Sequence, residues 1–174
     1  MKNFNFSFVD YMKGLAFKNR LLQHTDEKKA FYRVSSITNL EELLTSGSFG
    51  KNRCMLVIDG PEGRMVDNES DNLLDNQYYT FFIVEHVEQN DPDKRQQALV
   101  MCMYVVKQVL GKMFLDKRND QKGKTPLTGL GNLDRASIYY KEFGPIGDNF
   151  WGYMVSFSLI EPPNIRYNEQ DWID

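Results

Sequence analysis

Three acidic residues at alternate positions form the densest set of metal-ligand side chains in the sequence. Asp67, Glu69 and Asp71 follow one another at steps of two, and alternating carboxylates can converge on a hard cation such as Ca²⁺. A calcium loop that begins at Asp67 would also need glycine at its sixth position and a bidentate glutamate at its twelfth. Those positions hold Asn72 and Tyr78. The pattern therefore favours solvated loop carboxylates over a metal site.

The two histidines, His24 and His86, do not form a local motif. Histidine ligands of zinc are often closely spaced, as in H-x-x-x-H, and a serine nucleophile would need a base that converges on it. We interpret both histidines as surface residues. A metal-dependent hydrolase built from Asp67, Asp71 and His86 stays open as the weakest alternative, because acids from distant segments can converge in a fold.

The glycine patterns do not match a nucleotide site. Gly129-Leu-Gly131 begins like a dinucleotide fingerprint, but Asp134 occupies the third glycine position and no apolar strand precedes the motif. The sequence contains neither a P-loop lysine motif nor a G-x-S-x-G nucleophile elbow. We therefore expect a protein that is not an enzyme and that binds no cofactor.

The two cysteines, Cys54 and Cys102, are too few for a disulfide framework. Cys54 falls in a predicted strand and Cys102 on the apolar face of a predicted helix. Free buried cysteines behave as small hydrophobic residues, so we predict no metal at either one. This usage is typical of a reducing cytoplasm.

Length and composition indicate one globular domain. The chain has 174 residues, of which 41% are hydrophobic and 26% charged. A chain of this length and composition can bury a core without disulfides or structural metal ions. We assign residues 1–163 to a single domain and residues 164–174 to a C-terminal tail. A net charge of −3 argues against nucleic acid as the main partner.

The sequence also argues against a membrane partner. No uninterrupted apolar run approaches the roughly 20 residues of a bilayer span, and the first residues lack the pattern of a signal peptide. We expect a cytoplasmic protein, or a virion protein if the chain is a phage component.

Hydrophobic periodicity predicts an α+β fold with a largely antiparallel sheet of about four to five strands. Two or three helices pack on this sheet, and a β-hairpin lies near the C-terminus. The helices are expected at residues 9–23, 38–45 and 92–114, and the strands at 30–34, 54–58, 76–88, 137–143 and 150–160. Thr38 and Glu41 fit a capping box at the second helix. Polar, glycine-rich residues 60–76 and 118–132 are expected to be loops.

The strand at 76–88 is apolar on both faces. One face carries Tyr79, Phe81 and Ile83, and the other carries Tyr78 and Phe82. Such a strand must be covered on both sides, either by helices or by another subunit.

The strand at 150–160 alternates more cleanly than any other segment. Trp151, Tyr153, Val155, Phe157 and Leu159 share one face, which we expect to pack on the apolar stripe of the 92–114 helix. The opposite face is Gly-Met-Ser-Ser, and it lies against either solvent or another subunit.

Two further groups are candidate contact residues. Lysines and arginines gather at the end of the 92–114 helix, namely Lys112, Lys117, Arg118, Lys122 and Lys124. They either stabilise the negative end of the helix dipole or contact phosphate or an acidic partner. Tyr167 and Trp172 in the tail either pack back on their own domain or anchor to a neighbouring subunit.

The order of these elements is similar to that of the small α+β proteins of tailed bacteriophages known as tail terminator or tail completion proteins. The strand YYTFFIVEHVE, the helix DPDKRQQALVMCMYVVKQVLGKM and the late strand FWGYMVSFSLIEP carry the resemblance. The resemblance implies a non-enzymatic protein that forms a ring of subunits, caps the tail tube and joins the tail to the head. It assigns no functional residue.

The leading hypothesis is thus an assembly protein whose partners are proteins, above all copies of itself. The alternative is an adaptor domain with one protein partner of another kind. The candidate contact residues are Tyr78, Phe82, Lys117, Arg118, Lys122, Lys124, Tyr167 and Trp172.

Overall fold

The computed structural model describes residues 6–46, 53–67, 73–88, 91–124 and 128–161. Within these ranges the chain forms three α-helices, one short 3-10 helix and six strands. The elements are α1 (Phe8–Lys18), β1 (Phe31–Arg33), α2 (Ile37–Thr45), β2 (Met55–Ile58), β3 (Glu62–Asp67), β4 (Leu73–His86), α3 (Pro92–Gln121), η1 (Leu130–Asn132), β5 (Leu133–Ile146) and β6 (Phe150–Glu161). The predicted α+β class is confirmed.

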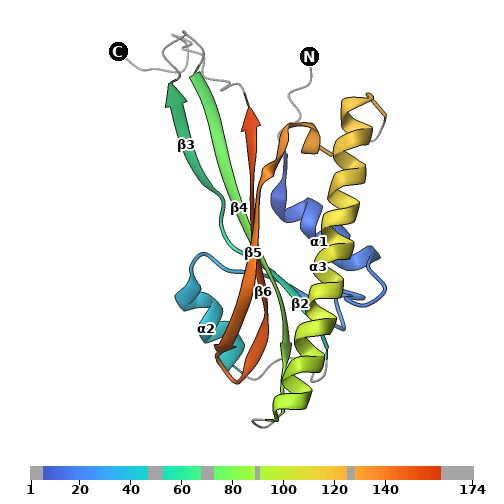
Figure 1. Cartoon of the computed structure of the whole chain (residues 1–174), viewed down its shortest axis with the longest axis vertical. Coiled ribbons are helices and arrows are strands. Elements are labelled where there is room, and N and C mark those ends of the chain that lie inside the picture. Colours follow the sequence, from blue (N-terminus) through green and yellow to red (C-terminus); the bar gives the residue numbers. More distant parts are fainter. Residues whose placement is uncertain (1–5, 47–52, 68–72, 89–90, 125–127, 162–174) are drawn as a thin grey trace.

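The sheet has the strand order β1-β2-β4-β6-β5, and β3 also pairs with β4. β1 and β2 are parallel, whereas every other pair is antiparallel. β2 pairs with Phe81–Val84 and β3 with Leu73–Tyr78, so the two short strands share one edge of β4. β4 and β6 form the long central ladder in Figure 1. The predicted C-terminal hairpin is present as β5–β6.

Helices cover both faces of the sheet. α1 and α3 pack on one face, where Met12 and Val105 join Phe81 and Phe157 in the larger core. α2 packs on the other face, where Leu40 and Leu44 join a smaller core around Phe82. Figure 1 shows α1 and α3 on one side of the sheet and α2, near one end of the molecule, on the other. Burial of these apolar side chains is the main stabilising term of the fold.

The predicted packing of β6 on α3 is confirmed. Val155 and Phe157 are buried in the larger core together with Cys102 of α3. On the opposite face of β6, Gly152 lies against β4, where an added Cβ would be 1.9 Å from the carbonyl oxygen of Ile83. The small residue at this position is therefore required by the backbone of the neighbouring strand.

The expectation of a loop at residues 60–76 was wrong, because β3 and the first part of β4 fall there. The segment carries exposed side chains on both faces, such as Arg64 and Met65, and so lacks the apolar alternation that marks a half-buried strand. Backbone pairing with β4, from Glu62–Tyr78 onward, forms the strand. The sheet thereby gains one strand over the predicted number.

The helix ends also differ from expectation. α1 stops at Lys18 because the side chain of Asn19 accepts hydrogen bonds from the N–H groups of Leu21 and Leu22. The N-cap of α2 is Ser36, whose Oγ accepts from the N–H of Asn39, and Thr38 lies inside the helix.

α3 continues to Gln121, through residues that had been expected to form the start of a loop. The ion pair of Lys112 with Asp116, four residues later, supports this last polar part of the helix. Among the described helices, α3 alone is long and apolar enough to cross a membrane, and the core helix of a sheet protein satisfies the same criteria.

Candidate interaction surface

The outward face of β4 is covered along only part of its length. Phe82 is 1% exposed and packs under α2, whereas Tyr78, four residues earlier on the same face, is 43% exposed. The prediction that Phe82 contacts a partner was therefore wrong, because the chain's own helix covers it. Tyr78 stays available, and its hydroxyl accepts a hydrogen bond from Asn76 at 2.8 Å.

Beyond α2, this side of the sheet presents a surface that we call the open sheet face. Directly opposed residues of antiparallel strands point to the same side, so the pairing of the strands defines its members. Its apolar, aromatic and small hydroxyl members are Val66 on β3, Tyr78 and Thr80 on β4, Ser156, Ser158 and Ile160 on β6, and Tyr139 on β5. The polar side chains Glu62 and Arg64 of β3 and Asn76 of β4 lie on the same side, at its edge. The two tyrosines, the valine and the isoleucine are exposed. Large side chains thus surround a smooth centre of small hydroxyl residues.

A second exposed apolar surface follows the outer side of α3, and we call it the outer stripe. Its members are Val100, Met101, Tyr104, Gly111, Phe114 and Leu115, and the exposed polar side chains Lys107 and Gln108 separate the first three from the last three. Val100 and Tyr104 are 60% and 56% exposed. At 3.6 residues per turn, these positions lie opposite the buried stripe that contains Val105 and Val109. α3 therefore carries large apolar side chains on both sides, whereas a helix that only covers a sheet needs one apolar side.

Gly111 lies in the middle of the outer stripe, far from either end of α3. A Cβ added there would meet nothing within 4 Å, so the fold of this chain does not need a glycine at the position. Glycine inside a helix costs about 0.5–1 kcal/mol relative to alanine. A residue that is unfavourable for the helix and leaves a flat spot on its exposed side suits close approach by another backbone.

At the charged end of α3, Lys117 forms its hydrogen bonds within the chain. The ammonium group of Lys117 donates to the carbonyl oxygens of Gly131 and Leu133, at 2.9 and 2.8 Å. These hydrogen bonds tie the 3-10 helix η1 and the start of β5 to α3. Lys117 therefore holds this corner of the fold together, and its ammonium is not free for a partner as the sequence had suggested.

The other predicted cations, Arg118, Lys122 and Lys124, are exposed. Arg118 and Arg135 border a hollow of about 600 Å³ beside Phe114. The guanidinium of Arg135 lies 6.0 Å from the centre of the Phe114 ring, which is within cation–π range. This hollow extends the outer stripe toward the start of β5 and adds positive charge to its end.

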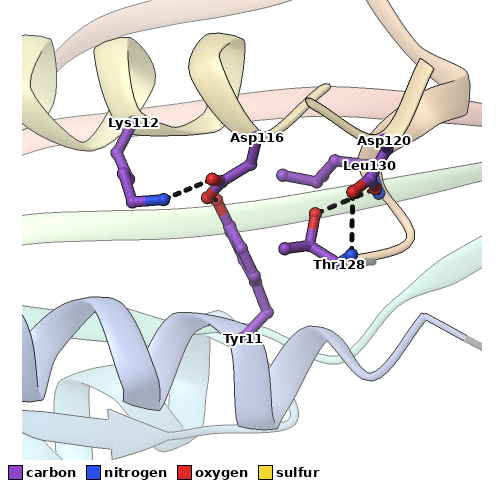
Figure 2. Close-up of polar contacts among 6 residues, drawn as sticks. All are labelled: Tyr11, Lys112, Asp116, Asp120, Thr128 and Leu130. Atoms are coloured by element: carbon purple, nitrogen blue, oxygen red, sulfur yellow. Dashed lines mark hydrogen bonds and ion pairs between the residues drawn. The ribbon is translucent and has the colours of Figure 1, made fainter. Parts of the chain in front are cut away.

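A polar network joins α1 to α3 near this end (Figure 2). Tyr11 reaches across from α1, and its hydroxyl donates to Asp116 Oδ2 at 2.8 Å, while Lys112 pairs with the other oxygen of Asp116. Asp116 is buried, and a buried carboxylate needs such partners. The network therefore fixes the distance between the two helices.

Asp120 holds the segment that follows α3 against the last turn of that helix. Its carboxylate accepts hydrogen bonds from the N–H and hydroxyl of Thr128, both at 2.9 Å, and from the N–H of Leu130 at 2.8 Å. Figure 2 shows the two contacts with Thr128, and Leu130 beside the same carboxylate. Three donors of its own chain thus bind this carboxylate.

A cavity of about 370 Å³ lies between α1 and α3 beside this network. Asp10, Lys18, Asp116 and Lys124 contribute both signs of charge to its wall. Burial and, after it, the hydrogen bond to Asp116 raise the pKa of Tyr11 far above its ordinary value. A phenol that resists ionisation in this way does not serve as a general base near neutral pH.

Both histidines were predicted to be surface residues, and neither side chain is fully exposed. His24 is only 6% exposed, and its Nδ1 accepts a hydrogen bond from the N–H of Ala30 at 3.2 Å, so the surface interpretation was wrong. His86 is half-buried, and its Nε2 lies 3.7 Å from Asp148 Oδ2. Among the described residues, neither histidine belongs to a cluster of metal-ligand atoms.

Several predicted residues cannot be placed. Tyr167 and Trp172 lie outside the described residues, as do Glu69 and Asp71 of the acidic motif, whereas Asp67 ends β3. The sequence analysis did not predict the outer stripe. Val100 and Tyr104 could have indicated it, because two apolar residues four positions apart lie on the same side of a helix, here the side opposite the core stripe.

Comparison with known proteins does not assign the chain to a family. No protein-family model, no curated protein and no solved structure matches it.

Proposed function

We propose that this protein is a non-enzymatic assembly subunit that self-associates head to tail. The outer stripe of one subunit packs on the open sheet face of the next, and the repeated contact closes into a ring. The proposal agrees with the resemblance to phage tail terminator proteins, in which such a ring joins the tail to the head.

The observation that carries the proposal is the apolar character of α3 on both sides. Its inner side already buries a full stripe against β4 and β6, yet Val100 and Tyr104 on the outer side are more than half exposed. Contiguous exposed apolar side chains mark interaction sites more often than chance exposure. Aromatic residues such as Tyr104 are also enriched at protein interfaces.

The head-to-tail arrangement follows from the positions of the two surfaces. α3 packs on one face of the sheet, and the open sheet face belongs to the other. A symmetric dimer uses the same patch on both partners, whereas two different patches on opposite sides generate rings or filaments. The small residues Thr80 and Ser156 at the centre of the open sheet face leave room for the bulk of Val100 and Tyr104.

The polar groups support a structural role. The buried carboxylate of Asp116 and the carboxylate of Asp120 border the cavity between α1 and α3, but both are bonded to their own chain, and these bonds stabilise the fold.

Two single variants and their mixture test the arrangement by light scattering. Tyr104→Asp places a charge in the outer stripe, and Tyr78→Asp places one in the open sheet face. Each variant alone should therefore be a monomer. A mixture of the two still contains one intact copy of each surface. It should therefore form a dimer that grows no further.

Phe17→Asp is the matched control, because Phe17 is an apolar α1 residue with 66% exposure outside both surfaces, and this variant should assemble like the wild type. If Tyr78→Asp assembles normally while Tyr104→Asp does not, the contact is symmetric through α3 and the head-to-tail arrangement is wrong. A wild-type monomer that binds one unrelated protein would favour the adaptor function instead.

A further inference from the structure

Two buried thiols and one carboxylate meet between the sheet and α3, away from both surfaces described above. Cys54 comes directly before β2, Glu85 is near the end of β4, and Cys102 is in α3. Their ligand atoms, Sγ of each cysteine and one carboxylate oxygen, all lie within 4.8 Å of one another. Three elements that are distant in sequence thus deliver one potential ligand each to the same point.

The distances are close to those of ligands around a tetrahedral metal ion. The two sulfurs are 3.8 Å apart, and Cys54 Sγ lies 3.2 Å from Glu85 Oε2. Zinc–sulfur bonds of about 2.3 Å at the tetrahedral angle place two sulfurs about 3.8 Å apart, and a Zn–O bond of about 2.0 Å places the oxygen about 3.5 Å from a sulfur. A disulfide would need the sulfurs at about 2.05 Å.

The surroundings also suit a cation. Both cysteines are buried among apolar core residues, and among the described residues Glu85 forms no ion pair with a lysine or an arginine. A carboxylate turned toward an apolar core gains most from a positive partner. Glu85 is half-buried and so leaves a path for an ion from solvent.

We propose that Cys54, Glu85 and Cys102 bind a divalent ion of the zinc class. Thiolates select soft or borderline ions such as Zn²⁺ over Ca²⁺ or Mg²⁺, and a carboxylate oxygen is a common third ligand. Water fills the fourth position. The bound ion links β2, β4 and α3, and it stabilises the core in which they meet.

Without a metal ion the Cys54 thiol is held in its neutral form. The hydrogen bond with Cys102, burial and the charge of Glu85 all raise the pKa of the Cys54 thiol. A thiol held neutral is a poor nucleophile, so Cys54 is not suited to act as a catalytic nucleophile.

Titration of the full chain with Co²⁺ tests the site directly, because bonds between thiolate and Co²⁺ give a charge-transfer absorption in the near ultraviolet. The protein is first freed of metal with a chelator under reducing conditions. We expect one Co²⁺ per chain, displaced by Zn²⁺, and a higher melting temperature with Zn²⁺. Glu85→Gln keeps both cysteines and should weaken Co²⁺ binding by about tenfold or more.

Glu142→Gln, at an exposed position of β5, is the matched control and should bind Co²⁺ like the wild type. Cys102→Ser should abolish most of the charge-transfer absorption. The proposal is overturned if the wild type gives no such absorption, if Glu85→Gln binds as tightly as the wild type, or if the purified protein contains a Cys54–Cys102 disulfide and no metal.

Discussion

His24 lies at the point where the segment after α1 turns toward β1. Its Nδ1 accepts the N–H of Ala30, and its ring lies 6.0 Å from that of Phe31. An accepting nitrogen carries no proton, so this geometry requires the neutral ring. Burial, and after it the charge of Lys13, lower the pKa of His24 below its ordinary 6.5.

This lowered pKa makes stability depend on pH. Below pH 6.5 the unfolded chain binds a proton at His24 more readily than the folded chain does, so protons favour unfolding. We expect the contribution of His24 to be complete above pH 6.5 and to be lost as the pH falls through the folded pKa. Urea unfolding at a series of pH values measures it. His24→Asn keeps an acceptor near Nδ1 without titrating and should flatten this part of the profile; an unchanged profile would contradict the assignment.

Tyr11 tests the link between α1 and α3. Tyr11→Phe removes the hydrogen bond to Asp116 and leaves a buried carboxylate with Lys112 as its remaining partner in the network. Hydrogen bonds to charged groups contribute about 1.5–3 kcal/mol, and the free energy of unfolding should fall by that amount. Tyr140→Phe, at an exposed position of β5 outside both surfaces, should change it by less than about 0.5 kcal/mol. Equal effects of the two variants would show that the network does not stabilise the fold.

At the scale of elements, apolar periodicity predicted the parts of the fold that bury side chains. The strand with Phe81 and Phe82 and the strand with Val155 and Phe157 were both found, because each has to fill a core. β3 was missed because its side chains face solvent, and only backbone pairing with β4 defines it. Helix ends depended on single side chains such as Asn19 and Ser36, whose capping bonds follow from local geometry.

The candidate surfaces were predictable only in part. The sequence identified both Tyr78 and Phe82 as candidate contact residues on one strand face. It could not show that Tyr78 is exposed and Phe82 buried, because the position of α2 decides which of the two is covered. Lys117 looked like any other lysine of its cluster until its bonds to two carbonyl groups were seen. Tertiary contacts, and not residue type, distinguish Tyr78 from Phe82 and Lys117 from the other lysines of its cluster.

Gly111 provides a test of the outer stripe at this scale. Gly111→Ala should raise the free energy of unfolding of the monomer by about 0.5–1 kcal/mol, because alanine favours the helix. The added methyl should also weaken assembly by about tenfold, since it would push apart two closely packed backbones. Chemical unfolding of dilute protein and sedimentation of concentrated protein measure the two effects.

Gly14 is the matched control for this test. It also lies inside a helix, and its added Cβ would likewise meet nothing within 4 Å. Gly14→Ala should stabilise the monomer in the same way and leave assembly unchanged. If both variants assemble like the wild type, no partner approaches α3 closely at Gly111.

Considered as a whole, the molecule has a covered half and an open half. α2 closes one face of the sheet over part of its length, and α1 and α3 cover the other face (Figure 1). What is left is an open sheet face on one side and an apolar outer stripe on the opposite side. A subunit with two complementary surfaces on opposite sides is suited to repeat its contact until a ring closes.

The mass of the wild-type protein in solution, measured by light scattering over a range of concentrations, tests this account most directly. Head-to-tail assembly predicts a defined multiple of the 20.3 kDa chain mass, which persists on dilution once the ring has closed. A mass of 20.3 kDa at every concentration would contradict self-assembly through these two surfaces.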